Sequence, residues 1–444
     1  MSIPPDSVAA VVPQPKADSV ASAPARRSRR PWRIAAVLMM VALAIGWFAG
    51  VPKLVLKHLA QRQLQRGMPH QALPWLNQAA KLNGTDAELE FLTARTYRLQ
   101  GNMTEVRSHL ERAWNLGYPV LKLEREQILA QAQSGQLGTA EPALAAMLVD
   151  PRGDMTDICE AYVVGYIRNY RLPQAERLLT AWLADSPRQP RALLLRAKMQ
   201  IDLLNWKAAE EDLRVVLSTV PDHAEAADIL AGVLLKQKKA EAALKVLPVA
   251  IKSPRMRLSA QLREVECHRI QGHAEAARNL LTSILKEHPE NVQAHLELGT
   301  LESDLNNFAA AVIELEQARQ LAPTVPDVRY ALAIALRGAG REAEAKEHFD
   351  FVIRAREALA EAMNLRPTVE QKPRDAELRC KIGTTLLDYG QTDRGLVWLQ
   401  SALDVDPRLT SAHQRMADYY ESRAKESDEF AALAVEHRKL GSIP

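Results

Sequence analysis

Residues of three types recur at intervals of 34 positions along much of this 444-residue chain. Alanine does so six times in succession, at Ala175, Ala209, Ala243, Ala277, Ala311 and Ala345. The same step separates Gly67, Gly101 and Gly135, and also Pro187 from Pro221, Pro289 from Pro323, and Pro373 from Pro407. Because each residue type keeps its own phase, the period indicates one structural unit copied along the chain. Each unit is expected to pack on its neighbours alone.

Each interval reads as two helices joined by a short turn. Between the periodic positions, apolar residues follow the i, i+3, i+4, i+7 spacing of a half-buried helix. In one unit Leu193 and Ala197 fall on the first helix, and Ala209 and Leu213 fall on the second. The alanines fall where two helices cross closely, and the prolines follow the second helix, which they stop. The sequence therefore predicts an all-α array of helical pairs.

Two units show a family pattern in detail. One carries Leu298-Gly299, Phe308, Ala311, Ala318 and Pro323, and another carries Lys381-Ile382-Gly383, Tyr389-Gly390, Leu399, Ala402 and Pro407. With the 34-residue period, these residues resemble tetratricopeptide-repeat (TPR) proteins. Val106 and Gly395 stand where the second helix usually has alanine, and the usual tryptophan of the first helix is missing. The resemblance implies a right-handed TPR superhelix, an α-solenoid of about ten units that binds proteins.

The chain divides into four parts on this reading. Residues 1–31 form a Pro/Ala-rich basic tail, residues 32–52 a transmembrane helix, residues 53–409 the TPR array, and residues 410–444 a C-terminal capping helix and tail. The units begin near residues 53, 87, 121, 156, 190, 224, 258, 292, 326 and 376, with one or two extra residues around Gly153. A helical insertion at about 354–373 lengthens the ninth unit. In the cap, Tyr419, Tyr420, Phe430 and Leu433 are expected to face inward.

Residues 34–51 contain no charged side chain. An uncharged run of this length is just long enough to cross a bilayer. Trp32 and Trp47 lie near the two ends, where indole rings prefer the membrane interface. A cleaved signal peptide is the first alternative, but no A-x-A cleavage site follows the apolar run. A twin-arginine export signal is the second alternative, and Ser28–Trp32 matches it only in part. We therefore predict an uncleaved single-pass anchor.

Positive charges flank this span on both sides. Five arginines precede it, at Arg26, Arg27, Arg29, Arg30 and Arg33, and four basic residues follow it, at Lys53, Lys57, Arg62 and Arg66. The denser first cluster favours a cytoplasmic N-terminus and a periplasmic or other extracytoplasmic array. Within the span, Ala42, Gly46 and Gly50 recur every four residues, a stripe that suits self-association or packing on a partner helix.

Composition and motifs exclude several functions. A net charge of +3, concentrated before the apolar run, predicts no binding of nucleic acid. The three cysteines, Cys159, Cys267 and Cys380, lie too far apart in sequence for a metal motif and are expected to be buried free thiols. No phosphate-binding loop or catalytic motif occurs. We therefore predict no catalytic residue, no bound metal and no cofactor.

The concave groove of such an array is lined by the first helix of each unit. Mapping the groove positions onto this sequence gives mixed charges and apolar patches, which suit an extended peptide or a partner helix. Five of these positions are predicted to bind the partner: Arg168, Lys198, Arg269, Tyr330 and Arg337. Tyr330 and the arginines are the best anchors, because Tyr and Arg dominate binding hot spots.

These features predict a membrane-anchored scaffold or adaptor that binds protein partners and organises a bacterial envelope assembly, secretion or polysaccharide-export complex. The first alternative is the same array facing the cytosol as a docking receptor for client proteins. The second alternative is an enzyme whose site lies in the groove or in the insertion at 354–373.

Overall fold

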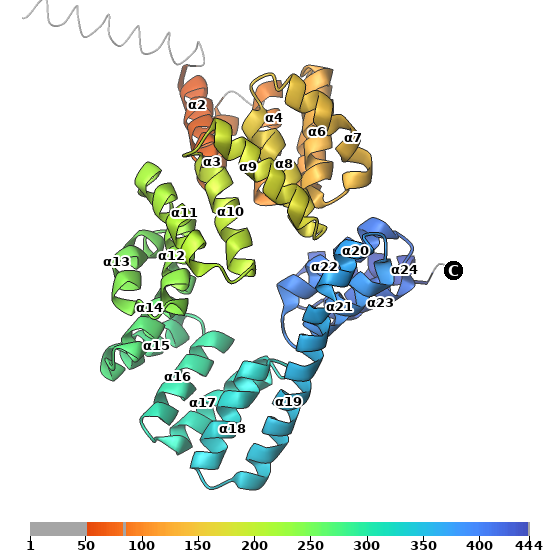
Figure 1. Cartoon of the computed structure of the whole chain (residues 1–444). Coiled ribbons are helices and arrows are strands. Elements are labelled where there is room, and N and C mark those ends of the chain that lie inside the picture. The colour runs from red at the N-terminus through yellow and green to blue at the C-terminus, as the bar shows by residue number, and fades with distance from the viewer. Residues whose placement is uncertain (1–50, 83–85, 443–444) are drawn as a thin grey trace, which may run out of the picture. The chain divides into compact units, whose positions relative to one another are not determined.

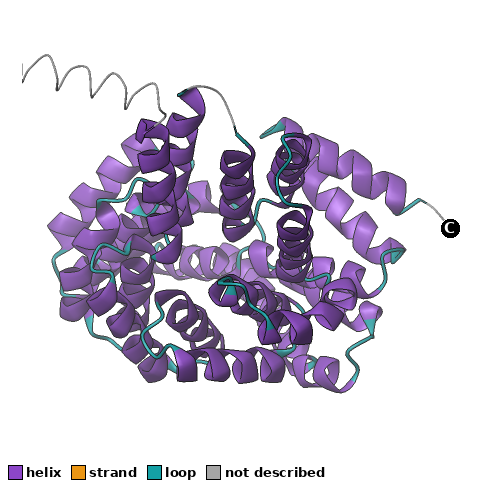
Figure 2. Cartoon of the chain, turned by 90° about the horizontal axis from the view of Figure 1, so that it is seen from above, coloured by secondary structure: helices purple, strands orange, loops and turns teal. Residues whose placement is uncertain are grey.

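The computed structural model describes residues 51–82 and 86–442, which contain helices and no strand (Figure 2). The helices form pairs, each with a first (A) and a second (B) helix joined by a short turn (Figure 1). The A helices of the first nine pairs are α2 (Val51–Gln65), α4 (Ala87–Gln100), α6 (Val120–Ser134), α8 (Met155–Arg168), α10 (Pro190–Asp202), α12 (Ala224–Lys236), α14 (Arg257–Ile270), α16 (Val292–Asp304) and α18 (Pro326–Gly338). Their B helices are α3 (Pro69–Lys81), α5 (Met103–Asn115), α7 (Leu137–Val149), α9 (Leu172–Asp185), α11 (Trp206–Thr219), α13 (Ala240–Ile251), α15 (Ala274–Glu287), α17 (Phe308–Leu321) and α19 (Glu342–Asn364).

The predicted all-α array of helical pairs is confirmed for the described residues. The periodic alanines lie in the core, where none exposes more than 2% of its surface. Gly395 replaces this alanine in a later pair and faces Gly383 on the partner helix, so that a Cβ added at Gly383 would lie 2.9 Å from the Gly395 carbonyl oxygen. The two helices approach each other there more closely than alanine would allow.

The turn between A and B helices repeats one backbone conformation. Ten turns each contain a residue with φ between +53° and +100°. These residues are Gly67, Gly101, Gly135, Tyr170, Leu204, Lys238, Gly272, Asn306, Gly340 and Gly390. Nearly all steps between them are 34 residues. The step from Gly135 to Tyr170 is 35, because one extra residue lies in the connection that contains Arg152 and Gly153, both also at positive φ.

The period breaks at α19, which runs for 23 residues. It leads into the short helix α20 (Arg366–Gln371), and the tenth pair, α21 (Ala376–Asp388) and α22 (Thr392–Val405), follows. An eleventh pair, α23 (Thr410–Ser422) and α24 (Asp428–Leu440), ends the described chain.

The aromatic residues expected to face inward in this last pair are only half-buried. Tyr419 and Tyr420 pack against the core of the last two pairs, and Tyr420 stacks on His437, while alanines, Met416 and two histidines fill the interior. The buried residues are Ala412, His413, Met416, Ala417, Ala434 and His437.

Distant pairs touch within Val55–Pro444, which forms one compact unit. Arg66, after the first A helix, forms an ion pair with Asp222, before the sixth. The ring of Tyr170 stacks on Trp398 at a centroid distance of 3.7 Å, and Arg379 Nη1 donates to the Asn169 carbonyl oxygen at 3.1 Å. Figure 1 shows the blue helices α20–α22 returning towards α8 and α9. The expectation that each unit contacts only its neighbours is therefore wrong at these two places.

The predicted transmembrane helix at 32–52 lies almost wholly outside the described residues, as do Ala42, Gly46 and Gly50. Within 51–82 and 86–442, no helix is both long enough and apolar enough to span a bilayer. The anchor, its orientation and its self-association stay predictions.

Candidate functional site

Successive A helices are joined by ion pairs along the array. Each pair links a residue of one A helix, or its cap, to a residue 27 to 35 positions further on. The ion pairs are Lys57–Glu88, Arg95–Glu126, Arg191–Asp157, Lys198–Glu225, Arg263–Asp228, Arg269–Glu297 and Arg415–Asp388. Because these bonds satisfy charges within the chain, much of the A-helix face offers few free charged groups to a partner.

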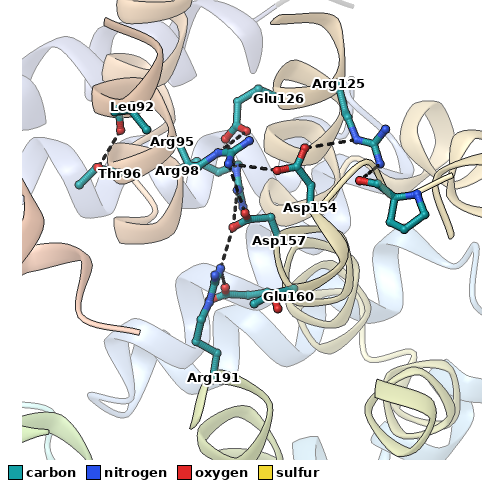
Figure 3. A network of polar contacts seen from close by, with 12 residues as sticks. Leu92, Arg95, Thr96, Arg98, Arg125, Glu126, Asp154, Asp157, Glu160 and Arg191 are labelled. Atoms are coloured by element: carbon teal, nitrogen blue, oxygen red, sulfur yellow. Dashed lines mark hydrogen bonds and ion pairs between the residues drawn. The ribbon is translucent and has the colours of Figure 1, made fainter. Parts of the chain in front are cut away.

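The densest part of this face is a buried network on α4, α6, α8 and α10 (Figure 3). Arg98 is fully buried and donates from Nε to Glu126 and from Nη2 to Asp157 at 3.2 Å. Arg95 bonds the other oxygen of Glu126 at 3.1 Å, and Arg191 donates to Asp157 at 2.9 Å. Buried charges are tolerated only when they are paired and hydrogen-bonded, as these are.

The arginines fix the charge state of this network. Burial by itself would raise the pKa of Asp157, but Arg191, Arg95 and Arg98 together hold it well below its ordinary value. Asp157 is therefore an anion at any physiological pH. A carboxylate that does not change its protonation state at physiological pH can join helices through ion pairs but cannot take part in proton transfer.

Three of the predicted groove residues are engaged within the chain. Lys198 pairs with Glu225 at 2.8 Å, and Arg269 pairs with Glu297 at 3.5 Å and with Asp304 at 3.3 Å. Arg168 donates to the Gln133 carbonyl oxygen at 3.3 Å, and burial lowers its pKa despite the charge of Asp404. The structure places these three side chains on separate pairs.

Tyr330 and Arg337 meet at one place. Tyr330 is 42% exposed and packs edge-on against Phe349 of α19 at a centroid distance of 6.0 Å. The Arg337 guanidinium lies 5.3 Å from the centroid of the same Phe349 ring. Both side chains cover the contact between α18 and α19, and their role in partner binding stays a prediction.

An apolar groove that the sequence interpretation missed lies between α5 and α6. It has a volume of about 480 Å³ and is floored by Val106 and Leu123, which are buried. Trp114, on its rim, is 62% exposed, and Val120 is 53% exposed. Two features of the sequence could have indicated this groove. Val106 replaces the usual alanine, and apolar residues cluster around Trp114 and Val120.

The described part of the chain gives little support for a reactive cysteine or a metal site. Cys159, Cys267 and Cys380 are free and buried. Burial raises the pKa of the Cys159 and Cys267 thiols to about 11, which leaves them protonated and unreactive. Among the described residues no cluster of three or more His, Cys, Asp or Glu side chains could hold a metal ion.

Comparison with known proteins supports the repeat assignment. Residues 270–326 match the model of a tetratricopeptide repeat, so the chain carries a TPR repeat there. No curated protein sequence matches the chain.

Several solved structures are similar to parts of this chain. The type IV pilus biogenesis factor PilW is 21% identical, with 43% of this chain and 89% of that chain covered and a TM-score of 0.40. The TPR protein TTC0263 of Thermus thermophilus is 24% identical, covering 45% and 99%, with a TM-score of 0.32. Human IFIT1, solved as a dimer with m7Gppp-AAAA, is 16% identical, covering 80% and 86%, with a TM-score of 0.39. At these values the likenesses say nothing about this chain's own partner.

Proposed function

We propose that this chain is a membrane-anchored, non-catalytic TPR scaffold that holds a protein partner in the groove between α5 and α6. The observation that carries the proposal is the exposure of Trp114, Val120 and neighbouring Leu121 around an apolar groove. Soluble surfaces rarely leave large apolar side chains together in water unless something covers them. Tryptophan is also among the residues that contribute most to protein interfaces.

A helical segment of the partner fits this groove best. Met103, Val106, Leu110 and Trp114 line one wall and follow the 3–4 residue spacing of a single helix face. A 13-residue helix such as α5 is about 20 Å long, enough to contact three to four turns of a helix laid beside it. An amphipathic helix with apolar residues at i, i+3, i+4 and i+7 would interlock with this wall.

The rim charges are of both signs and set the orientation of the partner. Arg107, Glu111 and Glu124 border the groove. None of them forms an ion pair with another described residue, in contrast to the groove positions Lys198 and Arg269. A partner with charges of opposite sign at the matching places would gain specificity and a faster association rate.

The test is co-purification in mild detergent from the native membrane, with wild type compared with Trp114→Ala plus Val120→Ser. We expect the double variant to lose a partner that wild type retains. The matched control is Val149→Ser plus Val435→Ser, which removes exposed apolar side chains away from the groove and leaves the partner bound. A partner list that is the same for all three proteins would remove the groove from consideration.

A photo-crosslinker makes the test direct. Placed at position 110, inside the groove, it should form a covalent adduct with the partner, whereas at position 149 it should not. Equal adducts at both positions would indicate non-specific contact and contradict the proposal.

The proposal also places the array outside the cytoplasm, with a role in organising a bacterial envelope assembly. Its support is the denser arginine cluster before the apolar segment. Protease added to spheroplasts should cleave the array. Cleavage only after the inner membrane is permeabilised would favour the alternative, a docking receptor that faces the cytosol.

A further inference from the structure

A second hollow lies where the fourth and tenth pairs touch. It has a volume of about 870 Å³ and is bounded by the turns after α6 and α8 and the starts of α7 and α9 on one side, and by α20, α21 and α22 on the other. We call it the inter-pair cavity. Its walls come from residues 135–177 and residues 369–405, which are far apart in sequence, so the period of the repeat does not predict it.

Arg379 is the central side chain of this cavity. It is 2% exposed and donates to the carbonyl oxygens of Asn169 and Pro373 and to the Ser401 hydroxyl at 2.6 to 3.1 Å. All of these acceptors are neutral, and the buried Nε of Arg379 has no hydrogen-bond partner. A buried guanidinium that hydrogen-bonds no carboxylate is costly to desolvate, and burial lowers the pKa of Arg379 although the charges of Asp404 and Asp375 oppose the shift.

The other charged side chains of the wall add to this positive excess. Arg177 and Arg374 line the cavity, are exposed, and bond no other described residue. Arg171 is held by Glu141 through two hydrogen bonds of 2.8 Å. These three arginines and Arg379 face only two described carboxylates in the lining, Glu141 and Asp404.

From this geometry we propose that the inter-pair cavity binds a small organic polyanion, carrying phosphate or carboxylate groups, through Arg177, Arg374 and Arg379. Guanidinium groups bind both oxyanions with paired hydrogen bonds, which is why arginine is common in such sites. The proposal does not depend on the protein-binding groove between α5 and α6.

The size and lining favour a small molecule. A volume of about 870 Å³ falls within the range of roughly 300–1,000 Å³ of small-molecule sites. Tyr170 lines the cavity, but its ring already stacks on Trp398 and carries the Arg366 guanidinium at 4.8 Å from its centroid. No free aromatic face is left there for a nucleic-acid base to stack on.

Such a ligand would join the two pairs. Arg177 belongs to α9, whereas Arg374 and Arg379 belong to the segment from α20 to α21. An anion bound by all three would stabilise the contact between the fourth and tenth pairs. Occupancy of the cavity and closure of the array are therefore coupled.

Titration calorimetry and thermal unfolding of the full-length protein in detergent test this proposal. The probes are pyrophosphate and citrate, with sodium chloride at equal ionic strength as the blank. We expect one of the two probes to bind and to raise the midpoint of unfolding. Tighter pyrophosphate binding assigns phosphate as the ligand group, and tighter citrate binding assigns carboxylate.

The decisive variant is Arg177→Gln plus Arg374→Gln. Both side chains are exposed and unbonded within the described chain, so the fold should survive and the affinity should fall by about tenfold or more. The matched control is Arg354→Gln, an exposed arginine of α19, with unchanged affinity. Arg379→Lys keeps a buried cation but loses the planar fork, and should also weaken binding.

Two results would overturn the proposal. One is the absence of binding by both probes to the wild-type protein. The other is equal affinity of wild type and the Arg177→Gln plus Arg374→Gln variant, which would mean that the anion lies elsewhere.

Discussion

At the scale of single residues, the turn between A and B helices is the most restrictive position. It requires a positive φ, which glycine adopts without cost and an L side chain adopts only under strain. Leu204, Lys238 and Asn306 nevertheless occupy it at φ of about 60°. The glycine period is visible in the sequence at Gly67, Gly101 and Gly135. It stops at the turns where another residue replaces the glycine, because these turns keep the backbone conformation but not the residue type.

Lys238→Gly should therefore stabilise the protein. Removing the strain of a left-handed lysine outweighs the greater freedom of glycine in the unfolded chain, for a net gain of about 0.5–1 kcal/mol. The measurement is the urea midpoint of unfolding. Gly272→Ala is the control, since its Cβ would meet no atom within 4 Å and would add only strain, so its midpoint should fall. A lower midpoint for Lys238→Gly would contradict the reasoning.

Asp404 provides a prediction about pH. Burial raises its pKa to about 6, although Arg168 and Arg379 oppose the shift. The folded state thus holds a proton that the unfolded state has released, so stability falls as pH rises from about 4 to about 6. Asp404→Asn removes this loss and should stabilise the protein at pH 7.5 by at most about 3 kcal/mol.

Thermal unfolding measured between pH 4 and pH 7.5 checks this expectation. The advantage of Asp404→Asn should shrink towards zero near pH 4, where the carboxyl of the folded wild type is already neutral. If Asp404→Asn is less stable than wild type at pH 7.5, the ionised Asp404 stabilises the fold through Arg168 and Arg379, and the expectation is wrong.

At the scale of elements, the helical pairs followed from the sequence because their packing is local. The contacts between an A helix and its B helix join neighbouring segments of one repeat, such as Arg196 with Asp212 and His295 with Glu314, and the alanine period marks these segments directly. The last pair is the exception. Tyr419 and Tyr420 pack on its core as expected, but the burial of His413 and His437 was not expected, since hydropathy alone does not reveal that two imidazoles can satisfy each other.

This histidine pair makes α24 sensitive to acid. His413 Nε2 donates to the Pro407 carbonyl oxygen at 3.0 Å, so His413 Nδ1 is the acceptor for His437 Nδ1–H at 2.9 Å. Burial lowers the pKa of His437, and the charge of His413 lowers it further. The unfolded chain therefore takes up a proton more readily, and stability is lost as pH falls below about 6.5.

Amide hydrogen exchange of α24 should accelerate between pH 7 and pH 5.5 beyond the intrinsic effect of pH. His437→Gln keeps a donor for His413 and removes one titrating group, so this acceleration should be smaller. The same protection of α24 at both pH values in wild type would rule out the histidines as the cause.

At the scale of the whole array, the contact between the fourth and tenth pairs is the feature that distinguishes this protein from a row of identical pairs. Tyr170 occupies a strained turn position, and its ring lies against Trp398, which is 1% exposed. Local geometry would favour glycine at this turn. Tyrosine stands there instead, and its ring makes a contact across the array.

Tyr170→Gly separates the two effects. It relieves the strained turn but deletes the stack, so the fourth pair should stay folded while α21 and α22 lose protection against hydrogen exchange. Leu204→Gly is the matched control, because it relieves the same strain at a turn with a 68% exposed side chain and should leave α21 and α22 unchanged. Unchanged protection of α22 in Tyr170→Gly would show that the stack does not hold the pairs together.

The sequence by itself determined the helical class, the pairing of helices and most unit boundaries, because these depend on contacts between residues within about one repeat. It also gave the free, buried cysteines. The inter-pair cavity, the desolvation of Arg168 beside Asp404 and the stack of Tyr170 on Trp398 were decided only by the tertiary structure. They depend on the small rotation between successive pairs, added up from the fourth to the tenth pair, and on the long helix α19. No local sequence pattern shows at which residues these added rotations bring distant pairs into contact.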